Sequence, residues 1–231
     1  MTGGTRGLGR ALVFAFARKG YRVYATARGA DALDDLAREA EQQALDVVPL
    51  RADVSRTDDN ARLVRRIEDD HRRADVVVHS AGLLGPRTEL AQYPPGVFQE
   101  VMAANVFGPF DLTRQLLPAL AAGAALLFVS SGASLGPRTR WGAYNVSKIA
   151  LDGLGGIWAK ELAPRGFRVY IVDPGPMRTA MRARAYPDED PATLDPPEAR
   201  TAAFLWLAEH GTPEQTGQRV EAKGWTPPSG E

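Results

Sequence analysis

The chain alternates between short apolar runs and longer stretches in which apolar residues recur with helical spacing. Short apolar runs rich in β-branched and aromatic residues are typical of strands, and those buried on both faces belong to parallel sheets. Strands that alternate with helices predict an α/β fold with a parallel sheet. The predicted strands are residues 21–28, 47–51, 75–79, 124–129, 168–173 and 217–222. The predicted helices are residues 10–18, 31–44, 97–120 and 198–209, with a further helix around 144–148.

The amino-terminal segment is a glycine-rich turn that leads into a helix. It runs Met1-Thr2-Gly3-Gly4-Thr5-Arg6-Gly7-Leu8-Gly9. Glycines in front of a helix let backbone N–H groups approach a phosphate, and the helix amino terminus adds a partial positive charge. The turn is therefore a candidate phosphate-binding site.

A strand is missing in front of this turn. A phosphate-binding turn of this kind follows a strand, yet Met1 is the single residue before Thr2. In a doubly wound sheet that strand lies in the middle, so its absence predicts two unpaired edges facing a gap. We hypothesise that the natural chain starts upstream of Met1 by at least one strand, roughly five or six residues. Mass spectrometry that finds Met1 at the natural amino terminus would refute this hypothesis.

Composition narrows the class of protein. The 231 residues, 44% of them hydrophobic, suit a single domain over residues 1–231. The formal net charge of zero gives no general attraction to nucleic acid or to an anionic membrane. The chain has no cysteine, and its three histidines, His71, His79 and His210, lack the spacing of metal ligands. We expect no bound metal and, without a secretory signal or a spanning segment, a cytoplasmic protein.

Candidate chemistry gathers around Tyr144 and Lys148, which lie four residues apart. On a helix this spacing places both side chains on one face, where the ammonium would lower the pKa of the phenol. A phenol tuned in this way can act as acid or base near neutral pH. Ser131 follows the strand 124–129, at the edge where parallel sheets bind ligands, so its hydroxyl can come beside the phenol. The three residues then supply a hydrogen-bond donor for a carbonyl oxygen and a proton source.

With Asn105 upstream, these residues match the Asn, Ser and Tyr-x-x-x-Lys signature of the short-chain dehydrogenase/reductase family, which the chain resembles over nearly its whole length. The Tyr–Lys pair alone would also fit a solvated helix face. The resemblance implies a Rossmann-like, doubly wound parallel sheet with helices on both faces. It also implies an oxidoreductase in which Ser131 holds a carbonyl oxygen and Tyr144 protonates it. Lys148 would lower the pKa of the phenol and bind the nicotinamide ribose, and Asn105 would anchor a relay water.

The resemblance further implies where a dinucleotide would bind. Arg28 follows Ala27, where NAD-dependent members carry an Asp, and Arg6 lies inside the glycine-rich turn. Two guanidinium groups suit a 2′-phosphate, so NADP(H) is expected rather than NAD(H), although two surface arginines would give the same pattern. The expected cofactor contacts are Thr2, Gly3, Thr5, Arg6, Gly7, Leu8, Gly9, Arg28, Asp53, Val54, Ala81, Gly82, Asn105, Tyr144, Lys148, Pro174, Gly175, Met177 and Thr179.

Three of these regions allow a second interpretation. Asp53 would lie near the adenine, but an Asp there can equally cap the following helix. His79 and Ser80 replace the two Asn that usually precede Ala-Gly in the family, so this strand must be braced differently, and we interpret His79 as structural. Asn105 sits in an apolar helical face and can be a structural Asn whose amide is satisfied internally.

The segment from about 180 to 197 is rich in Pro and Asp and lacks periodicity, and its length suits a substrate lid. Met177, Met181, Tyr186 and Trp141 can line an apolar pocket beside it. Nearby arginines could receive an anionic substrate, although the interpretation as solvated loop residues is preferred. These arginines are Arg138, Arg140, Arg182 and Arg184. Residues 226–231 are expected to form a loose tail.

The sequence leaves alternatives to an NADPH-dependent carbonyl reductase. One is a non-catalytic or truncated NADP(H)-binding protein, suggested by the absent strand and by the change at His79 and Ser80. The other is a dehydrogenase that works in the oxidising direction. Four intact catalytic positions favour an enzyme. The expected partners are a small carbonyl or alcohol substrate and further copies of the chain, as a homodimer or homotetramer.

Overall fold

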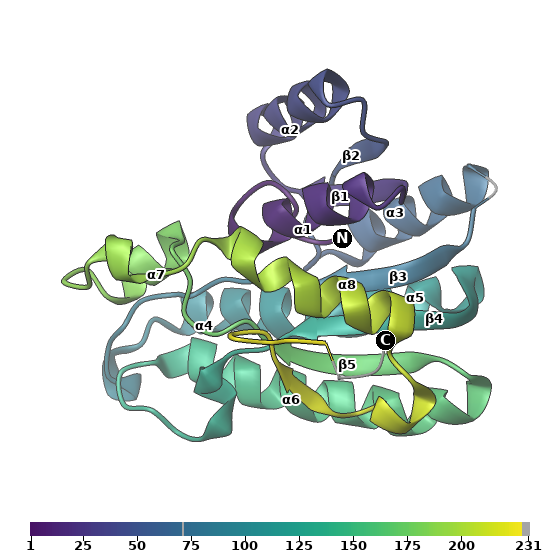
Figure 1. The fold of residues 1–231 in the computed structure, drawn as a ribbon. Helices are drawn as coiled ribbons and strands as arrows, with labels where there is room; N and C mark the ends of the chain where they lie inside the picture. Colours follow the sequence, from purple (N-terminus) through teal and green to yellow (C-terminus); the bar gives the residue numbers. More distant parts are fainter. Residues whose placement is uncertain (71, 228–231) are drawn as a thin grey trace.

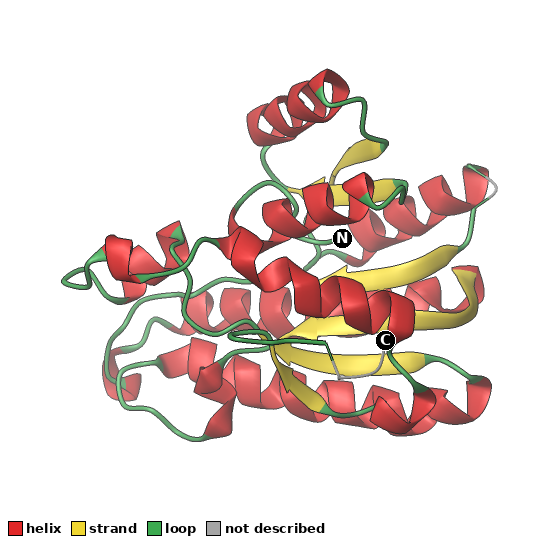
Figure 2. Cartoon of the chain, viewed as in Figure 1, coloured by secondary structure: helices red, strands yellow, loops and turns green. Residues whose placement is uncertain are grey.

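In residues 1–70 and 72–227, the part of the chain that the computed structural model describes, six parallel strands form the centre of the molecule (Figures 1 and 2). β1 pairs with β2, and β3, β4, β5 and β6 pair in that order. Every strand expected from the sequence is present, and the predicted α/β fold is confirmed. The strands are β1 (Val23–Ala27), β2 (Val47–Arg51), β3 (Ala74–His79), β4 (Leu120–Val129), β5 (Arg168–Asp173) and β6 (Arg219–Glu221).

Helices cover both faces of the sheet, as Figure 1 shows. β4 explains this arrangement: Leu127 packs into a core with α1, α2 and α8, whereas Leu126 and Phe128 pack into a second core with α3, α5 and α6. A strand buried on both sides has to be apolar throughout, which is why its sequence does not alternate. The α-helices are α1 (Gly7–Arg18), α2 (Ala30–Gln42), α3 (Thr57–Asp69), α4 (Pro95–Met102), α5 (Gly108–Leu116), α6 (Gly142–Leu162), α7 (Ala180–Ala185) and α8 (Thr201–His210).

The long helix expected over residues 97–120 is interrupted. α4 passes into a π-helical turn, η2 (Ala103–Phe107), before α5 begins, and residue 120 already belongs to β4. The break has a local cause, because Pro109 has no N–H to donate to the carbonyl of Asn105, four residues before it. A π-turn is a usual way for a helix to absorb such a defect.

The segment 180–197 is more ordered than its sequence suggests. It contains α7 and a 3₁₀ turn, η6 (Pro191–Thr193), where the sequence predicts an irregular loop. Thr179 caps α7, its hydroxyl accepting from the N–H of Arg182 at 3.2 Å. A six-residue helix is too short to reveal its period. The last helix begins as a 3₁₀ turn, η7 (Pro197–Arg200). Residues 228–231 of the expected tail lie outside the described residues, as does His71.

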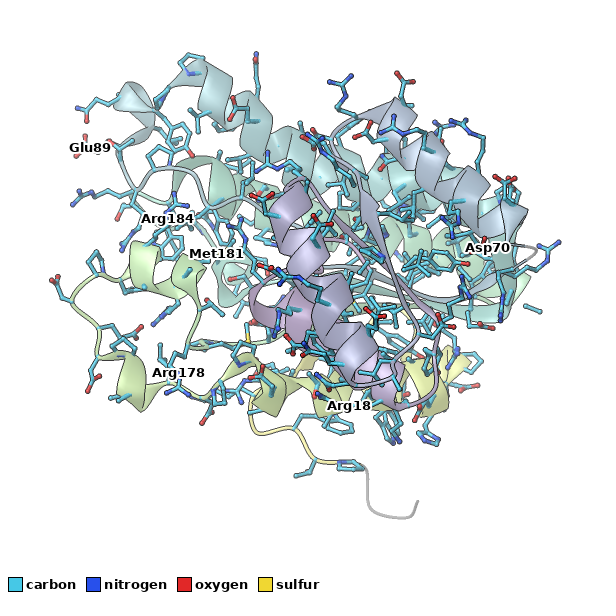
Figure 3. The ribbon with its side chains drawn as sticks, turned by 90° about the horizontal axis from the view of Figure 1, so that it is seen from above. Arg18, Asp70, Glu89, Arg178, Met181 and Arg184 are labelled. Carbon is cyan, nitrogen blue, oxygen red and sulfur yellow. The ribbon has the colours of Figure 1, made fainter. Side chains whose placement is uncertain are left out.

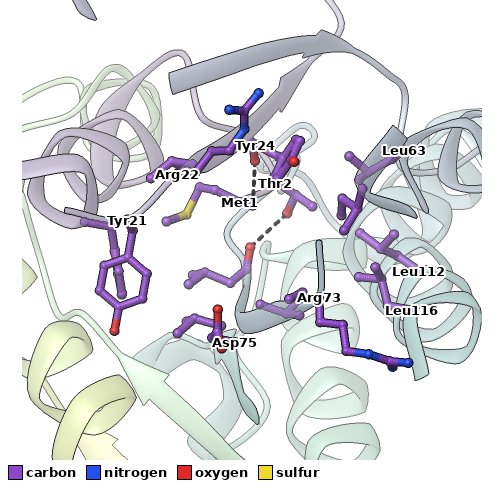
Figure 4. Close-up of a pocket in the computed structure, with 17 residues that line it drawn as sticks. Met1, Thr2, Tyr21, Arg22, Tyr24, Leu63, Arg73, Asp75, Leu112 and Leu116 are labelled. Carbon is purple, nitrogen blue, oxygen red and sulfur yellow. Dashed lines mark hydrogen bonds between the residues drawn. The ribbon is translucent and has the colours of Figure 1, made fainter. Parts of the chain in front are cut away.

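The gap expected in the middle of the sheet is present (Figure 4). In the described residues only Met1 and Thr2 lie between β1 and β3. The amino group of Met1 donates to the carbonyl of Tyr24 at 2.9 Å, and the N–H of Thr2 donates to the carbonyl of Val78 at 3.0 Å. A cavity of about 90 Å³ continues the gap beyond them. Its lining includes Val76 from β3, Leu63 from α3, and Leu112 and Leu116 from α5.

Candidate active site

Three predicted catalytic residues meet at the carboxyl end of β4. Ser131 follows this strand and caps the turn η4 (Gly132–Leu135), its Oγ accepting from the N–H of Ala133 at 3.2 Å. Tyr144 and Lys148 lie one turn apart on α6, and both side chains are buried. Lys148 Nζ donates to the carbonyl of Val129 at 2.7 Å and lies 5.8 Å from the centre of the Tyr144 ring. The predicted placement of both residues on one helical face is confirmed.

Burial governs the protonation of this group. It raises the pKa of the Tyr144 phenol, and a hydrogen bond with Ser131 offsets that rise only in part. Burial also lowers the pKa of Lys148 to about 8, against the opposing effect of Asp152 and Asp173. The raised phenol pKa is opposite to the direction expected from Lys148, because desolvation of the phenolate outweighs the other influences. Tyr144 is therefore a protonated phenol at neutral pH.

Asn105 lies in the π-turn η2 with its side-chain amide fully engaged. Its Oδ1 accepts from the N–H of Leu83 at 2.7 Å, and its Nδ2 donates to the Leu83 carbonyl and to Ser147 Oγ, both at 2.9 Å. These bonds tie the loop after β3 to α6, next to Lys148. They support the structural interpretation of the side chain. The backbone carbonyl of Asn105 lacks its α-helical donor because of Pro109, so a relay water would have to use that carbonyl.

The glycine-rich turn packs tightly against the end of β3. A Cβ on Gly3 would lie 2.9 Å from the Cα of Ala81, and a Cβ on Gly9 would lie 2.2 Å from the Gly3 oxygen, so both positions require glycine. Thr2 Oγ1 accepts from the N–H groups of Ser80 and Ala81, both at 3.1 Å, and its hydroxyl thus braces the turn. α1 starts without a side-chain cap and without an acidic residue in its first turn. Its positive end can therefore face an anion.

The turn after β5 meets the start of α1. The Thr179 methyl carbon lies 3.5 Å from the position of a Cβ on Gly7. Gly175, with φ of +68°, donates its N–H to Asp173 Oδ1 at 2.9 Å, which fixes the Pro174-Gly175 turn. Thr179 therefore lies beside Gly7 at the start of α1, and contact of Thr179, Gly175 and Gly7 with a dinucleotide stays a prediction.

Arg28 and Asp53 face each other beyond the ends of β1 and β2. Arg28 Nη1 lies 3.8 Å from Asp53 Oδ2, and the Arg28 side chain is 60% exposed. Arg6 is exposed as well. Asp53 Oδ1 accepts from the N–H and hydroxyl of Ser55 at 3.0 and 2.7 Å. It shapes the turn before α3 but does not cap that helix, whose N-cap residue is Arg56.

The other residues expected at the cofactor fall into two groups. Ala81 and Gly82 lie in the turn after β3, and Thr5 lies in the glycine-rich turn, so their backbones border the same edge. Leu8 and Val54 are buried, and their side chains belong to the core. Only backbone groups of Leu8 and Val54 could contact a ligand.

An apolar cluster surrounds the Tyr144 phenol. The Trp141 ring centre lies 5.8 Å from that of Tyr144 and 5.8 Å from that of Tyr186, and Met181 packs against the same cluster. The expected gathering of Trp141, Tyr186 and Met181 is therefore confirmed. Met177 was wrongly expected here; it packs against the large core with α1 and α8, because the turn after β5 directs it towards those helices.

Some arginines near this pocket are engaged by neighbouring groups. The guanidinium of Arg182 makes two hydrogen bonds to Glu189, both 2.6 Å, and lies 3.7 Å from the Tyr186 ring centre. Arg138 donates to the carbonyl of Gly132 at 2.6 Å. Figure 3 shows α7, with Met181 and Arg184, on the same side of the molecule as Glu89 in the loop after β3. Arg140 and Arg184 are exposed. Receipt of an anionic substrate by these arginines stays a prediction.

Sequence patterns do not reveal Arg87, although it is central to the pocket. Its guanidinium lies 4.8 Å from the Trp141 ring centre and 5.1 Å from the Tyr186 ring centre, and it donates to the carbonyl of Ala185. Arg200 is equally inconspicuous: it is buried and donates to the carbonyl of Pro174 at 3.0 Å. Both arginines fasten segments that border the site. Neither lies in a motif, so no local signal identifies them.

The described residues contain no helix with both the length and the apolar character needed to cross a bilayer. They also contain no group of three or more His, Cys, Asp or Glu side chains that could hold a metal ion.

Comparison with known proteins identifies the family. The chain belongs to the short chain dehydrogenases, whose family model matches residues 1–190. The uncharacterised oxidoreductase YciK of Escherichia coli K12 is 35% identical over 96% of this chain and 90% of its own length. A short chain dehydrogenase from Shigella flexneri, complexed with NADP, is 35% identical with a TM-score of 0.91, covering 96% of this chain and 95% of that chain. A further one, from E. coli CFT073 and complexed with NADPH, has the same identity and TM-score and covers 96% and 94%.

Proposed function

We propose that this oxidoreductase reduces the carbonyl group of a small molecule with NADPH, and that Tyr144 is the proton donor. The observation that carries the proposal is a buried phenol, kept protonated by its raised pKa, beside the Ser131 hydroxyl at the carboxyl edge of the sheet. A protonated phenol beside a carbonyl group supplies the proton that reduction consumes at the carbonyl oxygen. Trp141, Tyr186 and Met181 favour a substrate with an apolar group beside its carbonyl.

The roles of the side chains follow from their positions. When bound, NADPH supplies the hydride. Ser131 donates a hydrogen bond to the carbonyl oxygen, and Tyr144 transfers its proton to the same atom as charge develops there. Lys148, held at the carbonyl of Val129, stabilises the phenolate that remains and can reach the nicotinamide ribose. Asn105 fixes α6 against the loop after β3 through Ser147.

NADP(H) fits the residues that are present. The glycine-rich turn leaves no space for side chains at Gly3 and Gly9, and the uncapped start of α1 suits a diphosphate. Arg6 and Arg28 are exposed at the end where a 2′-phosphate would lie. The solved relatives in complex with NADP and NADPH support the same choice.

Replacing Arg28 tests the cofactor preference. Arg28→Ala should weaken NADPH binding about tenfold and leave NADH binding nearly unchanged, because only NADPH offers the charged partner. Fluorescence titration with each dinucleotide measures both effects. Arg165→Ala, an exposed arginine at the far end of α6, is the control and should change neither. Equal weakening of NADH and NADPH binding by Arg28→Ala would contradict the assignment.

Replacing Tyr144 tests the reaction. Tyr144→Phe keeps the ring and removes the proton, so kcat/KM for carbonyl reduction should fall by about 10²- to 10⁴-fold while the Kd for NADPH stays the same. The measurement is NADPH oxidation against a panel of ketones and aldehydes, with Tyr186→Phe as the control from the same pocket. Undiminished turnover in Tyr144→Phe would exclude the phenol as donor. NADPH binding without turnover of any carbonyl or alcohol would favour a non-catalytic binding protein.

A self-association surface is also proposed. Exposed apolar side chains lie along the π-turn, α5 and α6: Phe107, Phe110, Ile149 and Ile157 are 38–57% exposed. Such a patch suits a second copy of the chain, because a two-fold axis brings the same surface from each subunit together. Sedimentation velocity should find a homodimer or homotetramer that Ile157→Glu dissociates. A monomeric wild type would contradict this proposal.

A further inference from the structure

A charged cluster lies directly behind the catalytic serine, and its centre is Arg219 from β6. One guanidinium nitrogen, Nη1, donates to Asp152 Oδ2 at 2.7 Å and to Ser130 Oγ at 2.8 Å. The other, Nη2, donates to Asp173 Oδ2 at 2.7 Å and to the backbone carbonyl of Ser131 at 3.0 Å. One side chain therefore joins β6 to α6, β5 and the end of β4.

The carboxylate of Asp152 completes the cluster from the side of α6. It accepts from Ser130 Oγ and from Ser134 Oγ, each at 2.5 Å. The single hydroxyl proton of Ser134 is used in this bond, so its contact with the Ser131 carbonyl at 2.9 Å is an alternative to it. The N–H of Ser134 at 2.9 Å and Arg219 Nη2 at 3.0 Å hold the Ser131 carbonyl. Ser130 is buried, and the side chains of Asp152 and Arg219 are only 21% exposed. These partners fix the backbone of the residue whose hydroxyl meets the substrate.

We propose that Arg219 is a positioning residue of the active site, which sets Ser131 beside the Tyr144 phenol by binding the Ser131 carbonyl, Asp152 and Asp173 at once. The inference rests on the proposed function, since Ser131 and Tyr144 carry the reaction there. Planar guanidinium geometry is needed, because a single ammonium cannot reach the five acceptors on two sides, which include Ser134 Oγ at 2.9 Å. Arg219 does not contact the reacting atoms itself.

Arg219 also balances charge beside the reacting groups. Asp152 and Asp173 both raise the pKa of Lys148, and Asp173 raises the pKa of Tyr144. Without Arg219, the Asp173 carboxylate would act on the phenol with less compensation and make its proton harder to remove. The charged groups around this region are Lys148 and Asp152 from α6, Asp173 from β5, Arg219 from β6, and Arg138 from the loop before α6.

The test uses variants of the full chain. Arg219→Gln removes the charge and the planar guanidinium, Arg219→Lys keeps the charge, and Arg219→Gln with Asp173→Asn removes one charge of each sign. Arg168→Gln is the matched control, because Arg168 also donates to several carbonyls, including Gly211 at 2.8 Å, but stands at the opposite end of β5. Arg168→Gln should lower the Tm without changing the phenolate midpoint of Tyr144 or kcat.

Two readouts separate positioning from stability. The first is the midpoint of phenolate formation at Tyr144, obtained from ultraviolet absorbance as the difference between each variant and its Tyr144→Phe counterpart. The second is kcat and KM for carbonyl reduction, with NADPH affinity measured alongside. Arg219→Gln should raise the phenolate midpoint by about one pH unit and lower kcat about tenfold at nearly constant KM.

The remaining variants sharpen the result. Arg219→Lys should return the midpoint to that of the wild type but recover kcat only in part, and the double variant should also restore the midpoint. If Arg219→Gln and Arg219→Lys change only the Tm, as Arg168→Gln does, the positioning role is wrong. If the wild type reduces no carbonyl, the proposed function fails. The phenolate midpoints then still decide whether Arg219 controls Tyr144.

Discussion

His79 shows how one residue departs from its usual chemistry in this protein. Its ring is buried, stacks on Phe128 with centres 4.7 Å apart, and bonds Thr113 Oγ1 through Nε2 at 2.8 Å. Nδ1 is buried without a hydrogen-bond partner in the described residues. Burial lowers the pKa of His79 to about 3, so the ring is neutral at physiological pH. These contacts agree with the structural interpretation made from the sequence.

This burial predicts acid sensitivity. The His79 ring takes up a proton less readily in the folded state than in the unfolded state, where its pKa is about 6.5. The contribution of the neutral ring to the free energy of unfolding is therefore complete above about pH 6.5 and declines below it. The free energy of unfolding should fall by about 1.4 kcal/mol for each pH unit between about 6.5 and 4.5.

Urea unfolding at several pH values measures this dependence. His79→Asn should flatten the slope between about pH 6.5 and 4.5, because the residue that takes up the proton is gone. The slopes are compared rather than the absolute stabilities, since His79→Asn also loses packing. An unchanged slope in His79→Asn would mean that other groups cause the acid sensitivity.

At the residue scale, the sequence reveals chemistry that is local. Ser131, Tyr144 and Lys148 could be predicted because they lie within one strand-loop-helix unit. Arg219 and Arg87 could not, because their partners Ser131 and Ala185 lie 88 and 98 positions away along the chain. The raised pKa of Tyr144 was missed for a related reason: helical spacing reports a neighbouring charge but not the depth of burial.

At the scale of elements, α7 depends on side chains that fasten it. It has six residues and one buried residue, Ala185, so it has little hydrophobic face of its own. Arg87 binds the carbonyl of that residue and lies between the Trp141 and Tyr186 rings. Arg182 pairs with Glu189 across the following loop. These contacts hold α7 against the pocket.

Removing Arg87 should loosen α7. Arg87→Ala is expected to raise KM for the carbonyl substrate about tenfold, with a smaller change in kcat, because the pocket wall is lost while Ser131 and Tyr144 stay in place. Limited proteolysis should cut residues 180–197 faster than in the wild type. Arg165→Ala, which is exposed and lies after the far end of α6, serves as the control. An unchanged KM together with unchanged cleavage would show that Arg87 does not fasten the helix.

Element boundaries could be predicted where pattern and packing agree. β2 and β5 have the predicted bounds, since each strand ends at a turn that the sequence marks clearly. The helix expected at 97–120 was wrong because apolar periodicity continues through a π-turn, which changes the hydrogen bonding without changing the composition. α7 was missed because its Thr179 cap is visible in the sequence but its length is not.

At the scale of the whole molecule, the sheet consists of two ladders joined by Met1 and Thr2. The gap could be predicted from the sequence, because a phosphate-binding turn of this kind normally follows a strand. What the sequence does not show is how these two residues connect both sides: Thr2 bridges to Thr26 of β1 and to His79 of β3. The expected cytoplasmic location stays a prediction, which cell fractionation would test.

The joint that Met1 and Thr2 form between β1 and β3 affects which strands unfold locally first. In hydrogen–deuterium exchange, amides of β1 and β2 should exchange before those of β4, whose residues Leu126, Leu127 and Phe128 have no exposed surface. NADPH would contact Arg28 on one side of the joint and the site around Ser131 on the other. Its binding should therefore slow exchange most in β1 and β2, so that the dinucleotide acts as a clasp across the gap that Met1 and Thr2 bridge in the described residues.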